Sequence, residues 1–497
     1  MQADAASSLA EALDEACRSA PDRVALVHGG RRTTFAELRA AAAALAGEYR
    51  ARGIAPGERV VCSVSNRPEH VVALVGAWWA GVVHVCADYR STVRELAHVV
   101  GLAEARALVY EAPDGAAAPE ALRPGLEVFT VGEGIPPAGA EPVERATPSP
   151  DEPAIVFVTS GTTGAPKATI GYHGNLAARW QRLWRWLGFR PDDVHLAQMP
   201  LSHGFGLLTA VSALLANGSV VLLDRFSPAR ALDAIESERV TVLGGAPAHY
   251  RMLLHQQAEA PRDVTSLRFG IGTAAAFSPE LVAKIRDVLG LRLAIMYGSS
   301  EGIGVATTDQ EDIALGAVGR LSPGAATIVA PDRTPLPVGE LGEIAFSRAV
   351  FPVRYWGRDG RPLGEWYYSG DLGRLDEEGR LYVYGRLKHQ IDRGGLKIDP
   401  VEVEGALARS PGVADAAVLG VPDPVVGERV CACVVADAGE APTLEGIRTA
   451  LAAELAPYKL PEDLCVLDEI PRTAIGKTDV RALRARIEEA RRESVRV

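Results

Sequence analysis

The sequence predicts an α/β protein with a large N-terminal domain of sheets and helices and a small α+β C-terminal domain. Its 497 residues exceed what a single hydrophobic core normally serves. Strand and helix signals alternate along the early chain, which is typical of parallel sheets covered by helices. A run of glycine-bounded turns ends at about residue 385, and the remainder has the size of a small domain. We therefore expect domains at residues 1–387 and 388–497.

The first helix is predicted from Thr34 and Glu37, which have capping-box spacing ahead of apolar residues at steps of three and four. Thr92 and Glu95 repeat that signal before a later helix. The other early elements are a strand over 60–64, a buried helix over 69–80, and strands over 82–86, 107–110, near Val128 and over 154–158. The strand, helix and strand over 60–86 form a βαβ pattern, which predicts a parallel sheet.

The C-terminal segment predicts its own small set of elements. They are a helix beginning at Pro400 and ending near Ala408, strands over 414–420 and 429–436, and a helix over 443–454. Residues 111–150 are rich in Ala, Pro and Gly without a clear period and predict a surface excursion between two buried strands.

The charge balance argues against a broad anion-binding face. The 63 acidic residues exceed the 52 basic ones and give a net charge of −11, the wrong sign for a protein that grips nucleic acid or an anionic membrane. Only six of the basic residues are lysines, and 46 are arginines. A chain that uses arginine so consistently should keep lysine where a compact, flexible ammonium is needed.

Cysteine use and the N-terminal sequence indicate the compartment. Six scattered cysteines in a chain of this length do not form a disulfide scaffold, and buried thiols in a reducing cytoplasm explain them. The first twenty residues carry acids where a signal peptide needs bases. The longest apolar run, 71–83, is too short to span a membrane. We therefore expect a cytoplasmic protein that binds neither nucleic acid nor membrane.

The most informative segment follows the strand over 154–158. It reads Thr159-Ser-Gly-Thr-Thr-Gly-Ala-Pro-Lys167, a loop of small hydroxylated and glycine residues that ends in a lysine. Its backbone amides and hydroxyls can surround phosphate oxygens, and the ammonium can neutralise them. It is not a Walker loop, because proline precedes the lysine and alanine follows it.

This loop resembles the phosphate loop of the adenylate-forming superfamily, which includes acyl- and aryl-CoA synthetases, peptide-synthetase adenylation domains and luciferases. Seven further motifs follow in that family's order. They begin at Pro200 (PLSHG), Tyr297 (YGSSE), Tyr368 (YSGD), Gly385 (GRLK), Gly394 (GGLKIDPVEVE), Pro457 (PYKLP) and Pro471 (PRTAIGK). The resemblance spans residues of about 20 to 485. It implies a stand-alone acyl- or aryl-CoA ligase with a mobile C-terminal lid.

The resemblance implies an ATP site and a magnesium site. The ATP-binding residues are Thr159, Ser160, Gly161, Thr162, Thr163, Gly164, Lys167, Thr273, Ala274, Tyr297, Gly298, Ser299, Ser300, Asp371 and Arg386. Within this set Tyr297 lies against adenine, Asp371 holds the ribose hydroxyls, and Thr163 and Ser300 face phosphate oxygens. Glu301 is the expected Mg²⁺ ligand. The catalytic residues are Lys477, His203, Thr163 and Glu301.

By the same resemblance, Lys477 reaches across the cleft to bridge the carboxylate and the α-phosphate. Lys388 is the hinge at which the lid rotates, after which Gly394 and Gly395 approach the substrate carbonyl for attack by a thiol. His203 is the gate beside the tunnel for that thiol.

The acid itself is expected to carry no α-ammonium, because the segment after His203 offers no carboxylate to hold an amine. The predicted pocket consists of His203, Phe205, Leu207, Ala246, Gly272 and Gly298. An aromatic or medium-chain acid fits such a pocket. The segment Gly272-Thr-Ala-Ala-Ala276 departs from the family's usual Gly-Gly-Ala-Pro, which puts the substrate geometry in doubt.

CoA is the first choice of acceptor, and a separate carrier-protein thiol or another nucleophile is the alternative. A catalytically silent nucleotide-binding protein is a second class of function. It should have lost charge at Lys167, Glu301, Asp371 or Lys477, and all four charges are present. The sequence therefore favours an enzyme that uses ATP, Mg²⁺ and CoA.

Overall fold

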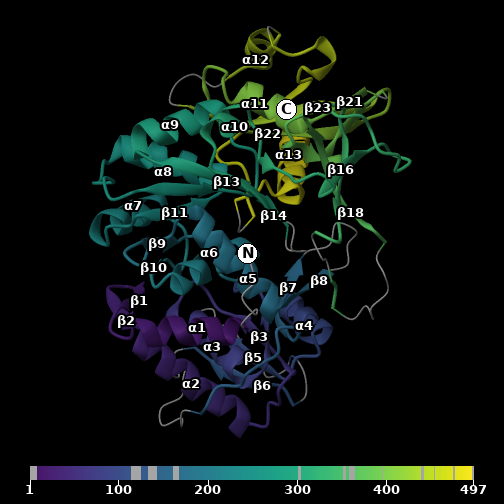
Figure 1. Ribbon diagram of the computed structural model, residues 1–497. Helices are drawn as coiled ribbons and strands as arrows, with labels where there is room; N and C mark the ends of the chain where they lie inside the picture. Colours follow the sequence, from purple (N-terminus) through teal and green to yellow (C-terminus); the bar gives the residue numbers. More distant parts are fainter. Residues whose placement is uncertain are drawn as a thin grey trace.

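The computed structural model describes most of the chain. The described residues are 8–112, 122, 125–131, 143–159, 167–299, 304–350, 354–356, 364–394, 396–437, 442–452, 454–473 and 476–494. They form four sheets, three in the N-terminal part and one in the C-terminal part. In Figure 1 the N-terminal layers lie at the bottom and the C-terminal part lies at the top.

The largest sheet has eight strands and is mostly parallel. In spatial order its strands are β14 (Gly304–Thr307), β13 (Arg292–Gly298), β12 (Phe269–Gly272), β11 (Val242–Gly245), β9 (Val194–Ala197), β10 (Ser219–Leu222), β1 (Val24–His28) and β2 (Arg31–Thr34). The edge strands β14 and β2 pair antiparallel with their neighbours.

A second sheet has six strands. In spatial order these are β6 (Glu127–Thr130), β5 (Ala107–Tyr110), β3 (Arg59–Ser63), β4 (Val83–Cys86), β7 (Pro153–Thr159) and β8 (Lys167–Tyr172). The predicted βαβ unit is confirmed, because β3 and β4 pair in parallel and are joined by α3 (Pro68–Ala80). At the sheet edge β7 and β8 pair antiparallel, with Thr159 opposite Lys167.

Helices fill the space between these two sheets and cover their outer faces. The helices of the large domain are α1 (Leu9–Ser19), α2 (Phe35–Ala51), α3, α4 (Val93–Leu102), α5 (His173–Leu187), α6 (Gly204–Leu215), α7 (Pro228–Ser237), α8 (Pro247–Glu259), α9 (Pro279–Leu289) and α10 (Gln310–Ala314). One continuous apolar core joins strand residues such as Leu26 and Val60 to side chains of α1, α3, α5 and α6. Two further cores cover the outer faces, one beneath α7, α8 and α9 and one beneath α4.

The helix starts follow from local chemistry. The predicted capping boxes are present at Thr34 and Thr92, where the threonine hydroxyl accepts from the backbone N–H of Glu37 and Glu95 respectively. The structure adds a third at Ser8, which begins α1. These helices bury apolar faces in the shared core, so the caps fix where each helix enters it.

A third, antiparallel sheet links the large domain to the C-terminal part. Its strands are β15 (Gly319–Arg320), β19 (Arg380–Arg386), β18 (Trp366–Leu375), β17 (Gly342–Ser347) and β16 (Ala326–Val329). The short helix η2 (Leu387–His389) follows β19 directly, and the next strand belongs to a different sheet.

The fourth sheet forms the small domain, here called the lid (residues 391–494). Its strands are β21 (Leu396–Ile398), β20 (Ile391–Arg393), β23 (Gly427–Ala436) and β22 (Val413–Asp423), with β24 (Asp463–Leu467) pairing parallel to β23. Its helices are α11 (Pro400–Leu407), α12 (Leu444–Leu451), η3 (Pro457–Lys459) and α13 (Val480–Ser494). Separate apolar clusters cover the two faces of this sheet.

All six cysteines are free thiols and buried, as the sequence predicts. Among the described residues, no helix is both long and apolar enough to cross a membrane.

Candidate active site

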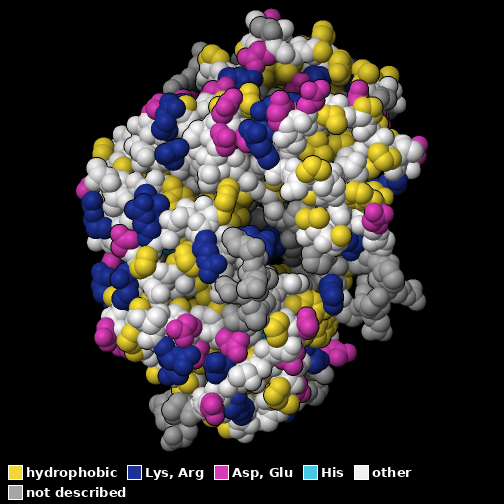
Figure 2. Space-filling view, in the orientation of Figure 1, with side chains coloured by type: hydrophobic (Ala, Val, Ile, Leu, Met, Phe, Trp, Pro, Cys, Tyr) yellow, Lys and Arg dark blue, Asp and Glu magenta, His cyan; other side chains and the backbone are white. Residues whose placement is uncertain are grey.

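A cleft between the large domain and the lid is lined by most of the predicted site residues whose side chains the structure describes. Its volume is about 3540 Å³, several times the roughly 300–1,000 Å³ of a pocket for a drug-sized ligand. The face shown in Figure 2 is hollowed at its centre, and Lys or Arg side chains lie beside the hollow. The cleft is wide enough for a nucleotide and a second substrate together.

The large sheet places its functional loops on one side of this cleft. Strands β9, β11, β12 and β13 run parallel, so their carboxyl ends share one edge of the sheet. The segments after three of them line the cleft, and they contain His203, Thr273 and Ser299. Ligands of open α/β sheets bind at this edge.

Asp371 is the centre of a polar cluster on the cleft wall. Its carboxylate accepts a hydrogen bond of 2.5 Å from the Tyr297 hydroxyl, and the Arg386 Nε lies 2.5 Å from its other oxygen. Arg386 is also the register partner of Asp371 across β18 and β19. Burial and the nearby Asp371 charge raise the pKa of Tyr297 above its usual value, so this hydroxyl remains a donor. The structure thus brings together three residues that the sequence assigns to ATP.

The turn before Asp371 explains its fixed orientation. Gly370 has a φ of +72°, which favours glycine, and its N–H donates to Glu343. The Asp371 N–H donates to the Ser369 hydroxyl, which in turn donates to the Ile344 carbonyl. The Ser369 hydroxyl therefore both accepts and donates a hydrogen bond within this turn.

His203 meets a partner that the sequence did not reveal. It precedes α6, and its Nε2 lies 3.2 Å from an Asp88 carboxylate oxygen, which comes from the loop after β4. Asp88 also accepts from the Arg90 side chain at 2.6 and 2.9 Å. Burial alone would raise the pKa of Asp88, but the hydrogen bonds from His203 and Arg90 outweigh it and lower that pKa. The anion fixes the orientation of the imidazole at the cleft.

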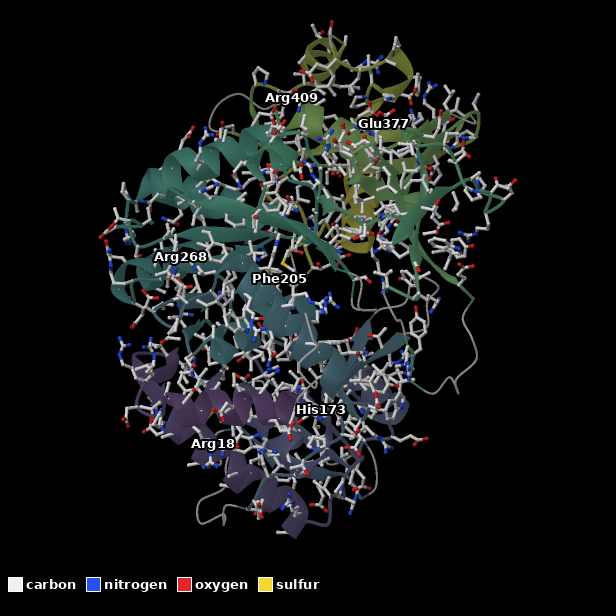
Figure 3. The ribbon with its side chains drawn as sticks, viewed as in Figure 1. Arg18, His173, Phe205, Arg268, Glu377 and Arg409 are labelled. Atoms are coloured by element: carbon white, nitrogen blue, oxygen red, sulfur yellow. The ribbon has the colours of Figure 1, made fainter. Side chains whose placement is uncertain are left out.

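Some residues of the pocket predicted for the carboxylic acid substrate line the cleft, and others are buried behind its wall. His203, Phe205 and Gly298 line the cleft, and Figure 3 labels Phe205 near the middle of the molecule. Leu207 differs from the expectation, because it packs in the core between the sheets and Leu208 lines the cleft instead. Ala246 and Gly272 also lie behind the wall and are buried.

Gly272 has a packing role at that position. A Cβ there would lie 2.7 Å from the Phe277 ring and 2.8 Å from Ile295. Gly244 plays the same part beside Phe205, whose ring would lie 2.9 Å from an added Cβ. These two glycines let aromatic rings approach the sheet edge closely.

The loop after β12 contains a strained residue. Ala274 has a φ of +73°, a conformation that non-glycine residues rarely adopt. It lines the cleft beside Thr273, whose N–H donates to the Gly245 carbonyl. The departure from the family's usual sequence therefore coincides with local backbone strain.

Lys477 reaches the cleft from a tight turn of the lid. The Thr473 N–H donates to the Lys477 carbonyl at 2.7 Å, and Gly476 adopts a φ of +75°. A Cβ on Gly476 would lie 2.7 Å from the His249 imidazole and 3.1 Å from Ala246, both at the start of α8. The turn is therefore seated on the large domain, and the exposed Lys477 lines the cleft.

Charged residues around that contact include several that sequence reasoning missed. Arg472, next to the turn, lies 2.5 Å from an Asp415 oxygen, and both belong to the lid. Arg251 of α8 faces them from the large domain, and desolvation lowers its pKa even though Asp415 and Glu404 attract it. Burial raises the pKa of Glu404 to about 7 and that of Asp399 to about 6. The lid thus meets the large domain through ionisable groups.

Arg179 is a further cation on the cleft wall that the sequence did not single out. It lies on α5, and a Cβ on Gly304 would be 2.5 Å from its guanidinium. Desolvation lowers its pKa, although an arginine keeps its charge at any physiological pH. Only tertiary packing places this residue at the site.

Gly394 and Lys388 lie where the chain passes from the third sheet into the lid. Gly394 has a φ of +60° between β20 and β21, is exposed, and is not part of the cleft wall. Lys388 lies within η2, between the last strand of the third sheet and the first of the lid. The described part of the cleft is therefore lined by the Lys477 turn and not by Gly394.

Several predicted residues lie outside the described part of the chain. They are Ser160, Gly161, Thr162, Thr163, Gly164, Ser300, Glu301 and Gly395, together with the side chains of Thr159, Lys167 and Lys388. The strands that flank the loop are described, and their pairing places it as the connection between β7 and β8.

Comparisons with known proteins agree with this architecture. A family model described as AMP-binding enzyme matches residues 13–356, and one described as AMP-binding enzyme C-terminal domain matches residues 402–477. A 2-hydroxy-7-methoxy-5-methyl-1-naphthoate–CoA ligase of Streptomyces carzinostaticus is 35% identical, over 96% of this chain and 93% of the relative. A feruloyl-CoA synthase of Amycolatopsis sp is 33% identical, over 93% and 95% respectively.

The solved structures include ATP-bound MatB from Rhodopseudomonas palustris. It superposes with a TM-score of 0.85 at 29% identity, over 96% of this chain and 98% of that one. Both family models, the relatives and this superposition cover the large domain and the lid together, so the chain belongs to the AMP-binding, adenylate-forming enzyme family.

Proposed function

We propose that the protein activates an aromatic carboxylic acid with ATP and transfers the acyl group to CoA. In the first step a carboxylate oxygen bonds to the α-phosphorus, and the bond to the β-phosphate oxygen breaks, which releases pyrophosphate. In the second step the CoA sulfur bonds to the acyl carbon, and AMP leaves. The observation that carries the proposal is the Lys477 turn, seated against α8 on the same cleft as Asp371 and Tyr297.

The first step brings one anion onto another, so it needs positive charge at the point of attack. Lys477 supplies a flexible ammonium from the lid, and its turn is already at the cleft. Asp371 and Arg386 orient the ribose, and the Tyr297 ring lies against the adenine. With this geometry the nucleotide is held on the large domain, while the lid brings the catalytic charge.

Magnesium would be held by Glu301 next to the triphosphate. The Ser299 hydroxyl just before it is buried on the cleft wall without a hydrogen-bond partner among the described residues, which fits a site for phosphate oxygens or metal-bound water. When bound, the ion spreads the negative charge of the phosphates.

The second step needs a path for the thiol and room at the carbonyl. We assign the His203–Asp88 pair to the entrance of that path, because the carboxylate fixes the imidazole at the cleft. Rotation at Lys388 would withdraw the Lys477 turn and bring Gly394 and Gly395 to the carbonyl. The lid therefore serves both steps in turn.

The relatives named above act on naphthoate and ferulate, which supports an aromatic acid. Phe205, Leu208 and Met296 offer an apolar wall at the cleft, and α6 carries no acid that could hold an amine. We place this reaction in the cytoplasm, where ATP and CoA are available and the six free thiols stay reduced.

Carboxylate-dependent exchange of pyrophosphate into ATP tests the first step over a panel of aryl, fatty and amino acids. The aryl acids should give the highest rates, and Lys477→Ala should reduce exchange by about 100-fold or more. Undiminished exchange in this variant would overturn the assigned role of Lys477.

Mass spectrometry of the products, with and without CoA, tests the second step. An acyl-CoA should form only when CoA is present. Release of AMP without a CoA thioester would reject the proposed acceptor while sparing the activation step, and addition of a carrier protein bearing a phosphopantetheine thiol would then test the alternative acceptor.

A further inference from the structure

A cluster of potential metal ligands lies buried in the second sheet, separate from the cleft. It consists of Cys62 on β3, His70 in the first turn of α3, and His84 on β4. One ligand atom from each residue lies within 4.8 Å of the other two, and this is the only such group found in the described ranges of the chain. None of the three lines the cleft.

The topology explains why these side chains converge. Strands β3 and β4 pair in parallel, with Val60 opposite His84 and Cys62 opposite Cys86. Side chains alternate between the faces of a strand, so Cys62, His84 and Cys86 share one face. The helix α3, in the lower part of Figure 1, covers that face, and His70 lies in its first turn.

His70 is held in the tautomer that a metal requires. Its Nδ1 lies 2.8 Å from the Val64 carbonyl and must donate to it, since a carbonyl oxygen only accepts. The lone pair is then on Nε2, which is buried and has no hydrogen-bond partner. A backbone carbonyl on the far nitrogen is the usual support of a metal-binding histidine.

His84 has no polar partner on either ring nitrogen, although it is fully buried. A buried polar atom without a hydrogen-bond partner destabilises the fold, and this cluster holds three of them. Apolar residues would fill the same space without that cost.

We propose that Cys62, His70 and His84 bind a thiophilic d¹⁰ metal ion, Zn²⁺ or Cu⁺. Metal bonds of about 2.3 Å to sulfur and 2.0–2.1 Å to nitrogen place neighbouring ligand atoms about 3.5 Å apart. The side chains therefore need to close by about 1 Å from the separations found here. On binding, the Cys62 thiol loses its proton, and that proton leaves to solvent.

The two ions require different numbers of ligands and different ligand charges in a buried site. Cu⁺ with one thiolate and two imidazoles is neutral and needs only three ligands. Zn²⁺ needs a fourth ligand and a second negative charge, and Cys86 is the neighbouring thiol on the same face. The substitution Cys86→Ser therefore separates the two: it should weaken Zn²⁺ and leave Cu⁺ unchanged.

The site would join β3, α3 and β4 at one point. Two residues after Cys86 the chain reaches Asp88, which holds His203 at the cleft. The loop before α3 contains Asn66, whose side chain donates to the carbonyls of Ala197 and Met199 just ahead of His203. A bound ion would therefore stiffen the support of the cleft without entering the reaction.

The test uses the full-length protein, freed of metal and equilibrated separately with Zn²⁺ and with Cu⁺ under reducing conditions. After gel filtration, elemental analysis should find about one ion per chain in at least one arm. His70→Phe, His84→Phe and Cys62→Ser should each lose that ion. His195→Phe is the matched control, because His195 is also buried with an unpartnered ring nitrogen but belongs to no such cluster.

Metal content near zero in both arms would overturn the proposal, as would retention of the ion by all three variants. If the variants do not fold, X-ray absorption of the loaded wild-type protein replaces them. Sulfur and two imidazole nitrogens around the ion would support the site, and a shell of oxygen ligands would reject it.

Discussion

At the scale of single residues, Asp371 joins two other predicted nucleotide contacts. Its two carboxylate oxygens are divided between the Tyr297 hydroxyl and the Arg386 guanidinium. The contact with the guanidinium depends on the negative charge. An amide in its place keeps the shape but cannot pair with the guanidinium.

We expect Asp371→Asn to raise the KM for ATP by about 10- to 100-fold, because hydrogen bonds to charged groups contribute about 1.5–3 kcal/mol. Steady-state kinetics with varied ATP measures this. Asp376→Asn is the control, since Asp376 also pairs with an arginine of the same sheet, Arg380, but does not line the cleft. An unchanged KM in Asp371→Asn would remove this residue from the nucleotide site.

Ala274 provides a test of strain. Its φ of +73° costs an alanine roughly 1–2 kcal/mol, a cost that glycine avoids. Since glycine also loses more entropy on folding, Ala274→Gly should raise the free energy of unfolding by about 0.5–1 kcal/mol. Urea denaturation measures it, with Ala276→Gly on the same exposed loop as the control that gains nothing. A loss of stability at position 274 would contradict the observed backbone geometry.

At the scale of elements, the Lys477 turn joins a backbone requirement to a packing requirement. Gly476 needs a positive φ, and an added Cβ would meet the His249 ring. Other turn glycines, such as Gly188 at the end of α5, have a positive φ but open space around them.

Gly476→Ala should therefore reduce pyrophosphate exchange by about tenfold or more, because the turn can no longer seat on α8. Gly188→Ala introduces only backbone strain and should leave pyrophosphate exchange unchanged. Thioester formation from a supplied acyl-adenylate should survive in both variants, since it does not use Lys477. Normal exchange in Gly476→Ala would show that the seated turn is not needed.

The elements themselves were largely predictable, because their signals are local. The capping boxes at Thr34 and Thr92 mark helix starts within four residues of sequence, and the βαβ pattern follows from apolar runs. The site was less predictable. Asp88 meets His203 from 115 residues away, and no local pattern encodes that pairing. The packing of Leu207 into the core, with Leu208 on the cleft wall, is likewise decided by how α6 is rotated against its neighbours.

The roles of the lysines were only partly predictable from the sequence. Lys477 lines the cleft, and Lys284 lies on α9 and does not line it. Lys459 is paired with Glu402 at 2.6 and 2.7 Å within the lid, which gives it a structural contact. A sequence can indicate that a lysine is unusual, but its partner depends on the folded chain.

At the scale of the whole molecule, stability should depend on pH through Glu404. Its folded pKa of about 7 lies above the ordinary 4.5 because burial penalises the anion. The favourable contribution of the neutral acid is thus fully present below pH 4.5 and is lost as the pH rises through about 7.

Glu404→Gln should flatten this loss of stability between about pH 5 and 7, because the amide stays neutral and its oxygen can still accept from the Val418 N–H. Thermal unfolding over that range measures it. Glu402→Gln, an exposed acid on the same helix, should retain the slope. A parallel slope in Glu404→Gln would locate the titrating group elsewhere.

The lid has apolar clusters on both faces of its own sheet, and all their members come from residues 391–487. Among the described residues, none of that apolar interior is shared with the large domain. The turn of the lid proposed above would therefore leave the buried apolar side chains of the lid covered. Across the domain boundary, Arg251 is attracted by Asp415 and Glu404 of the lid and repelled by Arg472, so the proposed turn has to overcome charge interactions. Salt screens such charge interactions. The rate at which the lid changes position between the two half-reactions should therefore change with ionic strength and depend little on the strength of hydrophobic interactions.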